Sequence, residues 1–153
     1  MKLRGGRISL FFAVALLLTG CGGPVVQPRS FDREAETASI LEQAIRYGVH
    51  QFAPRDDADG IAICIAIREG SVLRDPDPSV MRRLNTRQAQ PWTQCKAAAT
   101  LLIGPIEWLG DDEVRVKAGY VRASRGESRL AYRVVRENGN WICVGPIISW
   151  DPQ

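Results

Sequence analysis

The sequence lacks most of the residue patterns from which enzyme active sites are built. It has a single histidine, His50, so a nucleophilic cysteine would have only one imidazole as its base. It shows no phosphate-binding loop, no zinc-ligand spacing and no dinucleotide fingerprint. The acidic stretch 56–60 lacks the spacing and the terminal glutamate of a calcium-binding loop. These absences favour a non-enzymatic protein with no catalytic residue, metal or cofactor.

The sequence also lacks a hydrophobic run long enough to cross a bilayer, which takes about 20 residues. Its run Ile8–Leu18 has eleven residues and follows the basic residues Lys2, Arg4 and Arg7. A basic start before a short apolar segment is typical of a signal peptide. The run leads into Leu18-Thr19-Gly20-Cys21, which resembles the lipobox of bacterial lipoproteins.

The lipoprotein resemblance implies cleavage between Gly20 and Cys21 and a thioether from Cys21 to diacylglycerol. Two or more acyl chains hold a protein firmly on a membrane, because each buried CH₂ contributes about 0.8 kcal/mol. Residue 22 is glycine and not aspartate, which in Gram-negative lipoproteins implies the outer membrane, with the domain facing the periplasm. The chain then divides into a signal peptide (1–20), a lipidated tether (21–29) and a single domain (30–153).

The mature chain lacks an excess of either charge. Three of the 20 basic residues and none of the 17 acidic residues lie in the signal segment, so 17 of each remain. A neutral balance gives no support for nucleic acid or an acidic membrane surface as a partner. The expected membrane contact is therefore the lipid on Cys21.

Cysteine is scarce, and its number becomes odd once Cys21 carries lipid. Cys64, Cys95 and Cys143 remain in the domain. Because disulfides persist in exported proteins, we expect one bridge and one leftover thiol. Cys64 lies in an expected strand and Cys95 just after a loop, which favours the pair Cys64–Cys95. The alternatives are Cys64–Cys143 and no bridge at all.

The hydrophobic periodicity predicts an α+β domain. Apolar residues at helical spacing over 31–49, after a Ser30 cap, predict an amphipathic helix. Alternation over 61–68 predicts a strand, and Asp77 followed by proline predicts a short helix. From about residue 98 the pattern predicts a four-strand antiparallel meander.

Three turns determine the expected pairing in the meander. Asn138-Gly139 is a strong signal for a type I′ hairpin turn, and further turns are expected at 110–112 and 124–126. The resulting pairs are Trp141 with Arg136, Cys143 with Val134, Trp108 with Val114, Ile106 with Val116, Tyr120 with Leu130 and Ala118 with Tyr132.

One face of the meander collects the bulky residues, and we expect the long helix to pack on this face of a curved antiparallel sheet. Its expected members are Leu102, Ile106, Trp108, Val114, Val116, Tyr120, Leu130, Tyr132, Val134, Trp141 and Cys143.

The second face combines basic residues with apolar ones such as Ile103 and Val135. The basic residues are Arg115, Lys117, Arg129 and Arg133. Three interpretations stay open. Arginine stems cover the apolar atoms, the loop 85–97 lies across the face, or the face is a protein interface.

The order of elements is similar to that of the cystatin-like and nuclear-transport-factor-2-like α+β group. More narrowly, Gly104–Val114 (GPIEWLGDDEV), Gly119-Tyr120 and Tyr132–Trp141 (YRVVRENGNW) resemble uncharacterised exported bacterial proteins that share this meander. The resemblance covers about residues 60–150. Its motifs are turns and core strands, so it implies a fold and no chemistry.

Catalytic members of the nuclear-transport-factor-2-like group commonly use a His–Asp pair. Here that pair would join His50 to Asp56, Asp57 or Asp59. The alternative is a histidine at the end of a helix, where the helix dipole favours it.

Two functional hypotheses follow. The first is a membrane-anchored envelope lipoprotein, non-enzymatic, whose domain binds an envelope protein or forms a homodimer. The alternative is a small-ligand-binding or weakly catalytic domain with a pocket lined by aromatic residues, where Arg122 and Arg136 would meet an anion. The candidate lining residues are Trp108, Tyr120, Tyr132 and Trp141.

Overall fold

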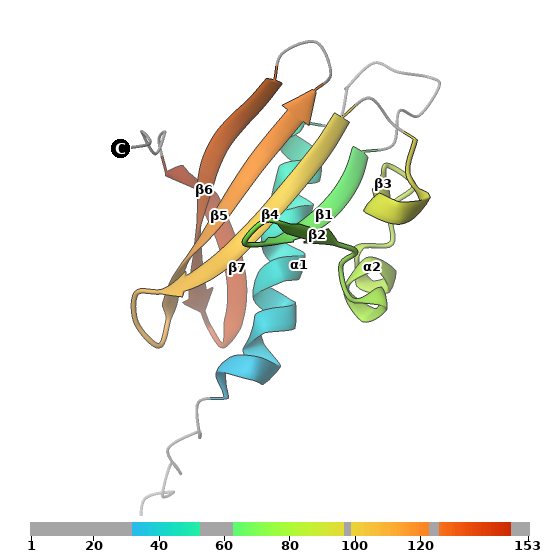
Figure 1. The fold of residues 1–153 in the computed structure, drawn as a ribbon. Helices are drawn as coiled ribbons and strands as arrows, with labels where there is room; N and C mark the ends of the chain where they lie inside the picture. Colours follow the sequence, from blue (N-terminus) through green and yellow to red (C-terminus); the bar gives the residue numbers. More distant parts are fainter. Residues whose placement is uncertain (1–31, 53–62, 97–98, 123–125, 148–153) are drawn as a thin grey trace, which may run out of the picture. The chain divides into compact units, whose positions relative to one another are not determined.

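The computed structural model describes residues 32–52, 63–96, 99–122 and 126–147, which form a mixed α+β unit (Figure 1). The helical elements are α1 (Arg33–Phe52), α2 (Pro78–Leu84) and a short 3₁₀ helix, η1 (Trp92–Gln94). The strands are β1 (Ile63–Glu69), β2 (Val72–Arg74), β3 (Ala89–Pro91), β4 (Ala99–Trp108), β5 (Glu113–Arg122), β6 (Gly126–Glu137) and β7 (Asn140–Ile147). The expected signal peptide, Cys21, the tether and Asp56, Asp57 and Asp59 lie outside the described residues.

The described strands form one open sheet in the order β2-β1-β4-β5-β6-β7, with β3 paired to β1. The meander β4–β7 is antiparallel throughout, as predicted. The expectation of a wholly antiparallel sheet is wrong, because β1 pairs in parallel with both β3 and β4. The segment containing β2 and α2 carries the chain back along the sheet, so β3 and β4 run in the same direction as β1.

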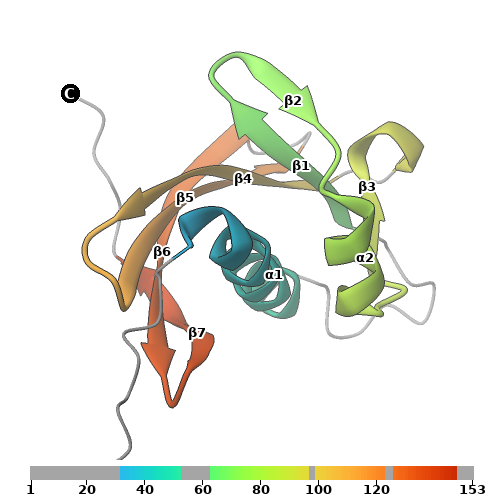
Figure 2. The ribbon, with the colours of Figure 1, turned by 90° about the horizontal axis from the view of Figure 1, so that it is seen from below.

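Helix α1 lies along one face of the sheet, which we call the inner face (Figure 2). Ile40, Ala44 and Ile45 are fully buried there. The helix approaches the sheet closely at Gly48, since a Cβ there would lie 2.5 Å from Leu101 Cδ2 and the Leu101 side chain would have to shift. The helix begins one residue after Asp32, whose carboxylate accepts hydrogen bonds from two backbone N–H groups of the first turn. The cap is therefore Asp32 and not the expected Ser30.

The short helix α2 begins as predicted. The Asp77 carboxylate accepts a hydrogen bond from Ser79 N at 2.7 Å, and Pro78 occupies the first helical position. The helix ends at Leu84 and is capped by Asn85, which adopts the left-handed conformation that asparagine tolerates.

The register of the meander agrees with the prediction in two of its three turns. The pairs across 109–112 and across Asn138-Gly139 are confirmed. Tyr120, however, pairs with Ser128 and not with Leu130, and Tyr132 pairs with Val116 and not with Ala118. Gly126, with φ +73°, begins β6 and is not the last residue of the turn. The resulting shift of two residues leaves each side chain on its predicted face.

A β-bulge in β4 changes the predicted inner face. The pairing of β4 with β5 shifts between Ile103 and Ile106, so that Gly104 and Pro105 of β4 lie opposite the single residue Lys117 of β5. Counting back from Ile106 with a period of two therefore selects Leu102, but Leu101 and Ile103 lie in the inner core. Leu102 lies on the opposite, outer face. The prediction for Leu102 and Ile103 is wrong because alternation does not continue through a bulge.

Candidate functional site

Three of the four aromatic residues proposed as a pocket lining belong to the inner core or pack against it, namely Tyr132, Trp141 and Trp108, and the fourth, Tyr120, is partly buried against α1. Tyr132 is fully buried, with its ring 5.4 Å from that of Tyr47. Tyr120 stacks on Phe52 of α1 at 4.4 Å. Trp108 and Trp141 make an edge contact at 5.9 Å. These side chains pack against α1 and against one another, and neither hollow described below is lined by them.

The arginines expected to meet an anion already have partners inside the protein. Arg136 forms an ion pair with Glu36 of α1, and Trp141 Nε1 donates to the second oxygen of the same carboxylate at 2.7 Å. Arg122 donates to the Tyr120 hydroxyl at 3.2 Å. Polar contacts within the protein therefore occupy these two arginines at opposite ends of α1.

The remaining candidates for chemistry do not come together in the described residues. His50 is exposed on α1, and its proposed aspartate partners lie outside the described residues. Burial raises the pKa of the Cys143 thiol and thus lowers its reactivity at neutral pH. Burial likewise raises the pKa of Tyr132, whose hydroxyl has no hydrogen-bond partner in the described part of the chain. No group of three or more His, Cys, Asp or Glu within the described ranges is arranged to hold a metal ion.

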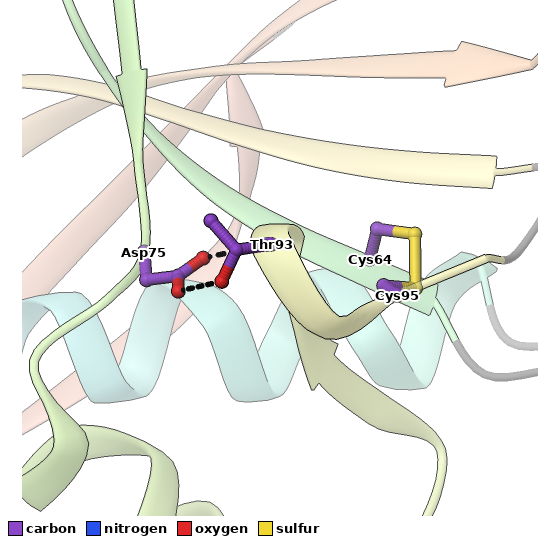
Figure 3. The surroundings of a disulfide bond; sticks show 4 residues. All are labelled: Cys64, Asp75, Thr93 and Cys95. Carbon is purple, nitrogen blue, oxygen red and sulfur yellow. Dashed lines mark hydrogen bonds between the residues drawn. A yellow bond between two sulfur atoms is a disulfide. The ribbon is translucent and has the colours of Figure 1, made fainter.

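The structure joins Cys64 to Cys95, the pair that the sequence favours, with the two Cα atoms 5.4 Å apart (Figure 3). Cys64 lies on the outer face of β1, so the disulfide holds η1 against that strand. The Asp75 carboxylate adds a second attachment by accepting hydrogen bonds from the backbone N and the hydroxyl of Thr93. The segment containing η1 therefore covers part of β1, and none of the described residues of the loop 85–97 lines the groove that follows on the outer face of the meander.

Beyond η1, the outer face contains a groove of about 530 Å³, which we call the outer groove. It reaches from β1 across β4, β5 and β6 to the end of β7. Its small and apolar lining includes Leu102, Gly104, Pro105, Gly119, Ala131 and Ile147.

Two glycines keep the floor of the outer groove low. A Cβ at Gly104 would lie 3.1 Å from Lys117 Cβ, and a Cβ at Gly119 would lie 3.1 Å from Glu127 Oε1. Larger residues would therefore fill the space that the groove occupies. Leu102 forms an apolar part of this floor and is only 3% exposed.

The wall of the outer groove is charged, with four cations and two carboxylates. These residues are Arg68, Glu107, Arg115, Lys117, Glu127 and Arg129. The excess of two positive charges gives the groove a preference for an anionic partner. The sequence pattern predicts Arg115, Lys117 and Arg129 on this face. Arg68, Glu107 and Glu127 are not among the residues predicted there.

Both carboxylates of the wall are held by arginines. Arg68 Nη1 and Nη2 donate to the two oxygens of Glu127 at 2.7 and 3.2 Å, although 59 residues separate them. This hydrogen bonding by Arg68 lowers the pKa of Glu127. Arg115 donates to Glu107 at 3.3 Å, while its buried Nε has no hydrogen-bond partner among the described residues. Arg129 is exposed and forms no ion pair within the described ranges.

A second, more open hollow lies at the β4–β5 turn and has the opposite charge. It is lined by four carboxylates, Asp111, Asp112, Glu113 and Glu137, and by two guanidinium groups, Arg133 and Arg136. Arg133 donates to both oxygens of Glu113 at 2.8 and 3.1 Å. Next to these carboxylates, Leu109 is 46% exposed. We call residues 109–112 the acidic turn.

The fold and these surfaces define a class: an α+β domain whose helix covers one sheet face and whose other face is grooved and charged. No helix of the described chain has the length and apolarity needed to cross a bilayer. Comparison of the sequence with protein-family models and with curated proteins, and of the structure with solved structures, found no match.

Proposed function

We propose that this chain is a lipid-anchored protein of the bacterial envelope whose domain is a non-catalytic binding module for a protein partner. The observation that carries the proposal is the outer groove, which combines an apolar floor with a positively charged wall. Interfaces commonly combine apolar residues with arginine. The anchor is supported by Leu18-Thr19-Gly20-Cys21 after a short apolar run.

The position of the groove is compatible with an anchor at the start of the chain. Glu36, near the beginning of α1, meets Arg136 near the end of β6. Phe52, at the end of α1, meets Tyr120, which pairs with Ser128 near the start of β6. The outer groove is lined by Glu127 and Arg129 at one end and by Glu107 and Arg115 at the other, next to Trp108, over which Arg33 of α1 lies. It therefore runs along the sheet on the face that α1 does not cover, and a partner can reach it from that face.

The chemistry of the groove supports binding and not catalysis. Its cations are arginines and one lysine, and its two carboxylates are engaged by Arg68 and Arg115. Arginine keeps its proton at any physiological pH, so it recognises anions well and exchanges protons poorly.

A second candidate function is the binding of a small amphipathic anion in the same groove. Its volume of about 530 Å³ supports this, because small-molecule sites typically measure about 300–1,000 Å³. The site would then lie on the outer face, and not among the aromatic residues of the inner core.

Photo-crosslinking in living cells tests the proposal. A photoreactive amino acid at position 129 should give light-dependent adducts with protein, whereas the same residue at position 39, exposed on α1, should give none. Adducts of equal yield at both positions, or none at 129, would contradict a binding role for the groove. In a parallel arm, Cys21→Ser should move the protein from the membrane fraction to the soluble fraction. Unchanged membrane association would refute the lipid anchor.

A further inference from the structure

We propose that the partner of the outer groove is a second copy of this chain, which inserts its acidic turn into the groove. This inference rests on the proposed function and specifies its partner. The two surfaces lie on the same domain, have opposite charge and each combine charged with apolar residues.

Charge complementarity is the first argument. The outer groove has two more cations than carboxylates, and the hollow at the acidic turn has two more carboxylates than guanidinium groups. Within the acidic turn, the side chains of Asp111 and Asp112 are exposed. Arg129 of the groove is exposed and enters no ion pair in the described ranges, so it can receive a carboxylate without breaking an internal contact.

The apolar groups are the second argument. Leu109 is 46% exposed at the acidic turn, and the apolar lining of the groove includes the solvent-accessible Pro105 and Ile147. Burying an exposed leucine against such a lining removes apolar surface from water on both copies. The low floor at Gly104 and Gly119 leaves room for a loop that also has a glycine, Gly110.

The geometry predicts a head-to-tail contact. The groove and the acidic turn are different surfaces, so a pair keeps one turn unoccupied on one copy and one groove unoccupied on the other. Such heterologous contacts continue until they close into a ring or extend into a filament. A single inserted turn buries little surface, so the isolated contact is weak. Anchoring on one membrane would strengthen it by raising the effective concentration.

Two charge-reversal variants of the full-length chain test this inference. Arg129→Glu disables the groove and leaves the turn intact, whereas Asp111→Arg with Asp112→Arg disables the turn and leaves the groove intact. Each variant, expressed with two different affinity tags, should co-precipitate its own second copy at least tenfold less than the unmodified chain does. Arg87→Glu, at an exposed arginine outside the groove, should change nothing.

Mixing the two variants provides the decisive measurement. The intact groove of one variant and the intact turn of the other should restore a pair, but nothing larger than a pair, in size-exclusion chromatography with light scattering. Failure to restore the pair, or an equal loss with Arg87→Glu, would overturn the inference.

The crosslinking experiment separates the two proposals. Adducts from position 129 that contain the peptide with residues 109–112 of a second copy support both. Adducts that contain only another protein, or displacement by a small carboxylate without any second copy, refute self-association and leave a binding role for the groove. Absence of any adduct contradicts both proposals.

Discussion

The two faces of the meander are built from alternate residues of the same strands, yet they differ in almost every physical property. On the inner face, Val114, Val116 and Tyr132 are fully buried beneath α1. On the outer face, Lys117, Gly119 and Arg129 line an open groove. The comparison indicates that the inner face supplies most of the stability, which leaves the outer face available for recognition.

The outer face is nevertheless not an ordinary solvated surface. Cys64, Ala66 and Leu102 are buried there, because η1 covers one part of β1 and long charged side chains cover another. Recognition at the groove therefore rests on a partly apolar surface held in place by a disulfide and by ion pairs.

The largest expected effect is at Tyr132. Replacement by alanine should lower the free energy of unfolding by about 3–5 kcal/mol, because it leaves a cavity in the inner core. Arg129→Ala should change it by less than about 0.5 kcal/mol. Urea denaturation measures both. Similar losses for the two variants would contradict the division of roles between the faces.

Tyr132→Phe separates the contribution of the Tyr132 hydroxyl to stability from that of its ring. The buried hydroxyl of Tyr132 has no hydrogen-bond partner in the described part of the chain, so its removal should be neutral or slightly stabilising. A loss of more than about 1 kcal/mol would show that the hydroxyl has a partner, such as a buried water molecule.

The second-largest effect is expected at the disulfide. Opening the bridge Cys64–Cys95, which has a sequence separation of 31, should cost about 3.5 kcal/mol through the entropy of the unfolded chain. Cys95→Ser should therefore lower the melting temperature under oxidising conditions, and added reductant should have no further effect on that variant. Cys143→Ser is the control, because Cys143 is a free thiol. A Cys143 variant that loses as much stability would contradict the assigned pairing.

A smaller effect is expected at Glu36, which links α1 to the inner face. Glu36→Gln removes a charge that both Arg136 and Trp141 use, so we expect a loss of about 1–3 kcal/mol. Because the indole of Trp141 lies in this cluster, its fluorescence should change in the folded state. The exposed Glu34→Gln is the control, with an expected loss below about 0.5 kcal/mol. Equal losses of unfolding free energy for Glu36→Gln and Glu34→Gln would show that the contacts of Glu36 with the sheet do not contribute to stability.

The inner face was largely predictable, because period-two alternation and the Asn138-Gly139 turn report local geometry. The prediction fails at Leu102. The bulge at Gly104 and Pro105 exchanges the inner and outer faces for the residues of β4 that precede it, and period-two alternation does not reveal a bulge. The parallel pairing of β1 with β4 depends on the path of the whole segment between them, which contains β2, α2, β3 and η1. A short sequence pattern does not determine that path.

The groove was predictable only in part. The positions of Arg115, Lys117 and Arg129 follow from their strands, but the contact of Arg68 with Glu127 joins residues 59 apart. It depends on the order of strands β1-β4-β5-β6, because both side chains must reach across β4 and β5. Gly119 lies directly beneath the Glu127 carboxylate. Its role in making room for that carboxylate can be inferred only once the strand order is known.

The smallest stability effect is expected at Glu127, where the outer face should respond to pH. The hydrogen bonds from Arg68 lower the pKa of Glu127 below its ordinary value of 4.5. The ion pair therefore contributes its full stability above that value and loses it as the pH falls through the lowered pKa. The contribution is below about 1 kcal/mol, because the pair is partly exposed. Urea denaturation of Glu127→Gln against the unmodified chain should show a small difference that vanishes in acid, whereas Glu137→Gln, outside the described ion pairs, should show none.

The same variant should have a much larger effect on recognition. In the unmodified chain Glu127 accepts hydrogen bonds from both Nη groups of Arg68, so an incoming carboxylate must compete with it. Glu127→Gln removes that competitor and raises the excess of cations in the groove from two to three, so self-association should strengthen severalfold while stability barely changes. Light scattering as a function of protein concentration measures this. Unchanged or weaker association would mean that Arg68 and Glu127 act as a structural pair, and that the outer groove does not attract acidic segments through its net charge.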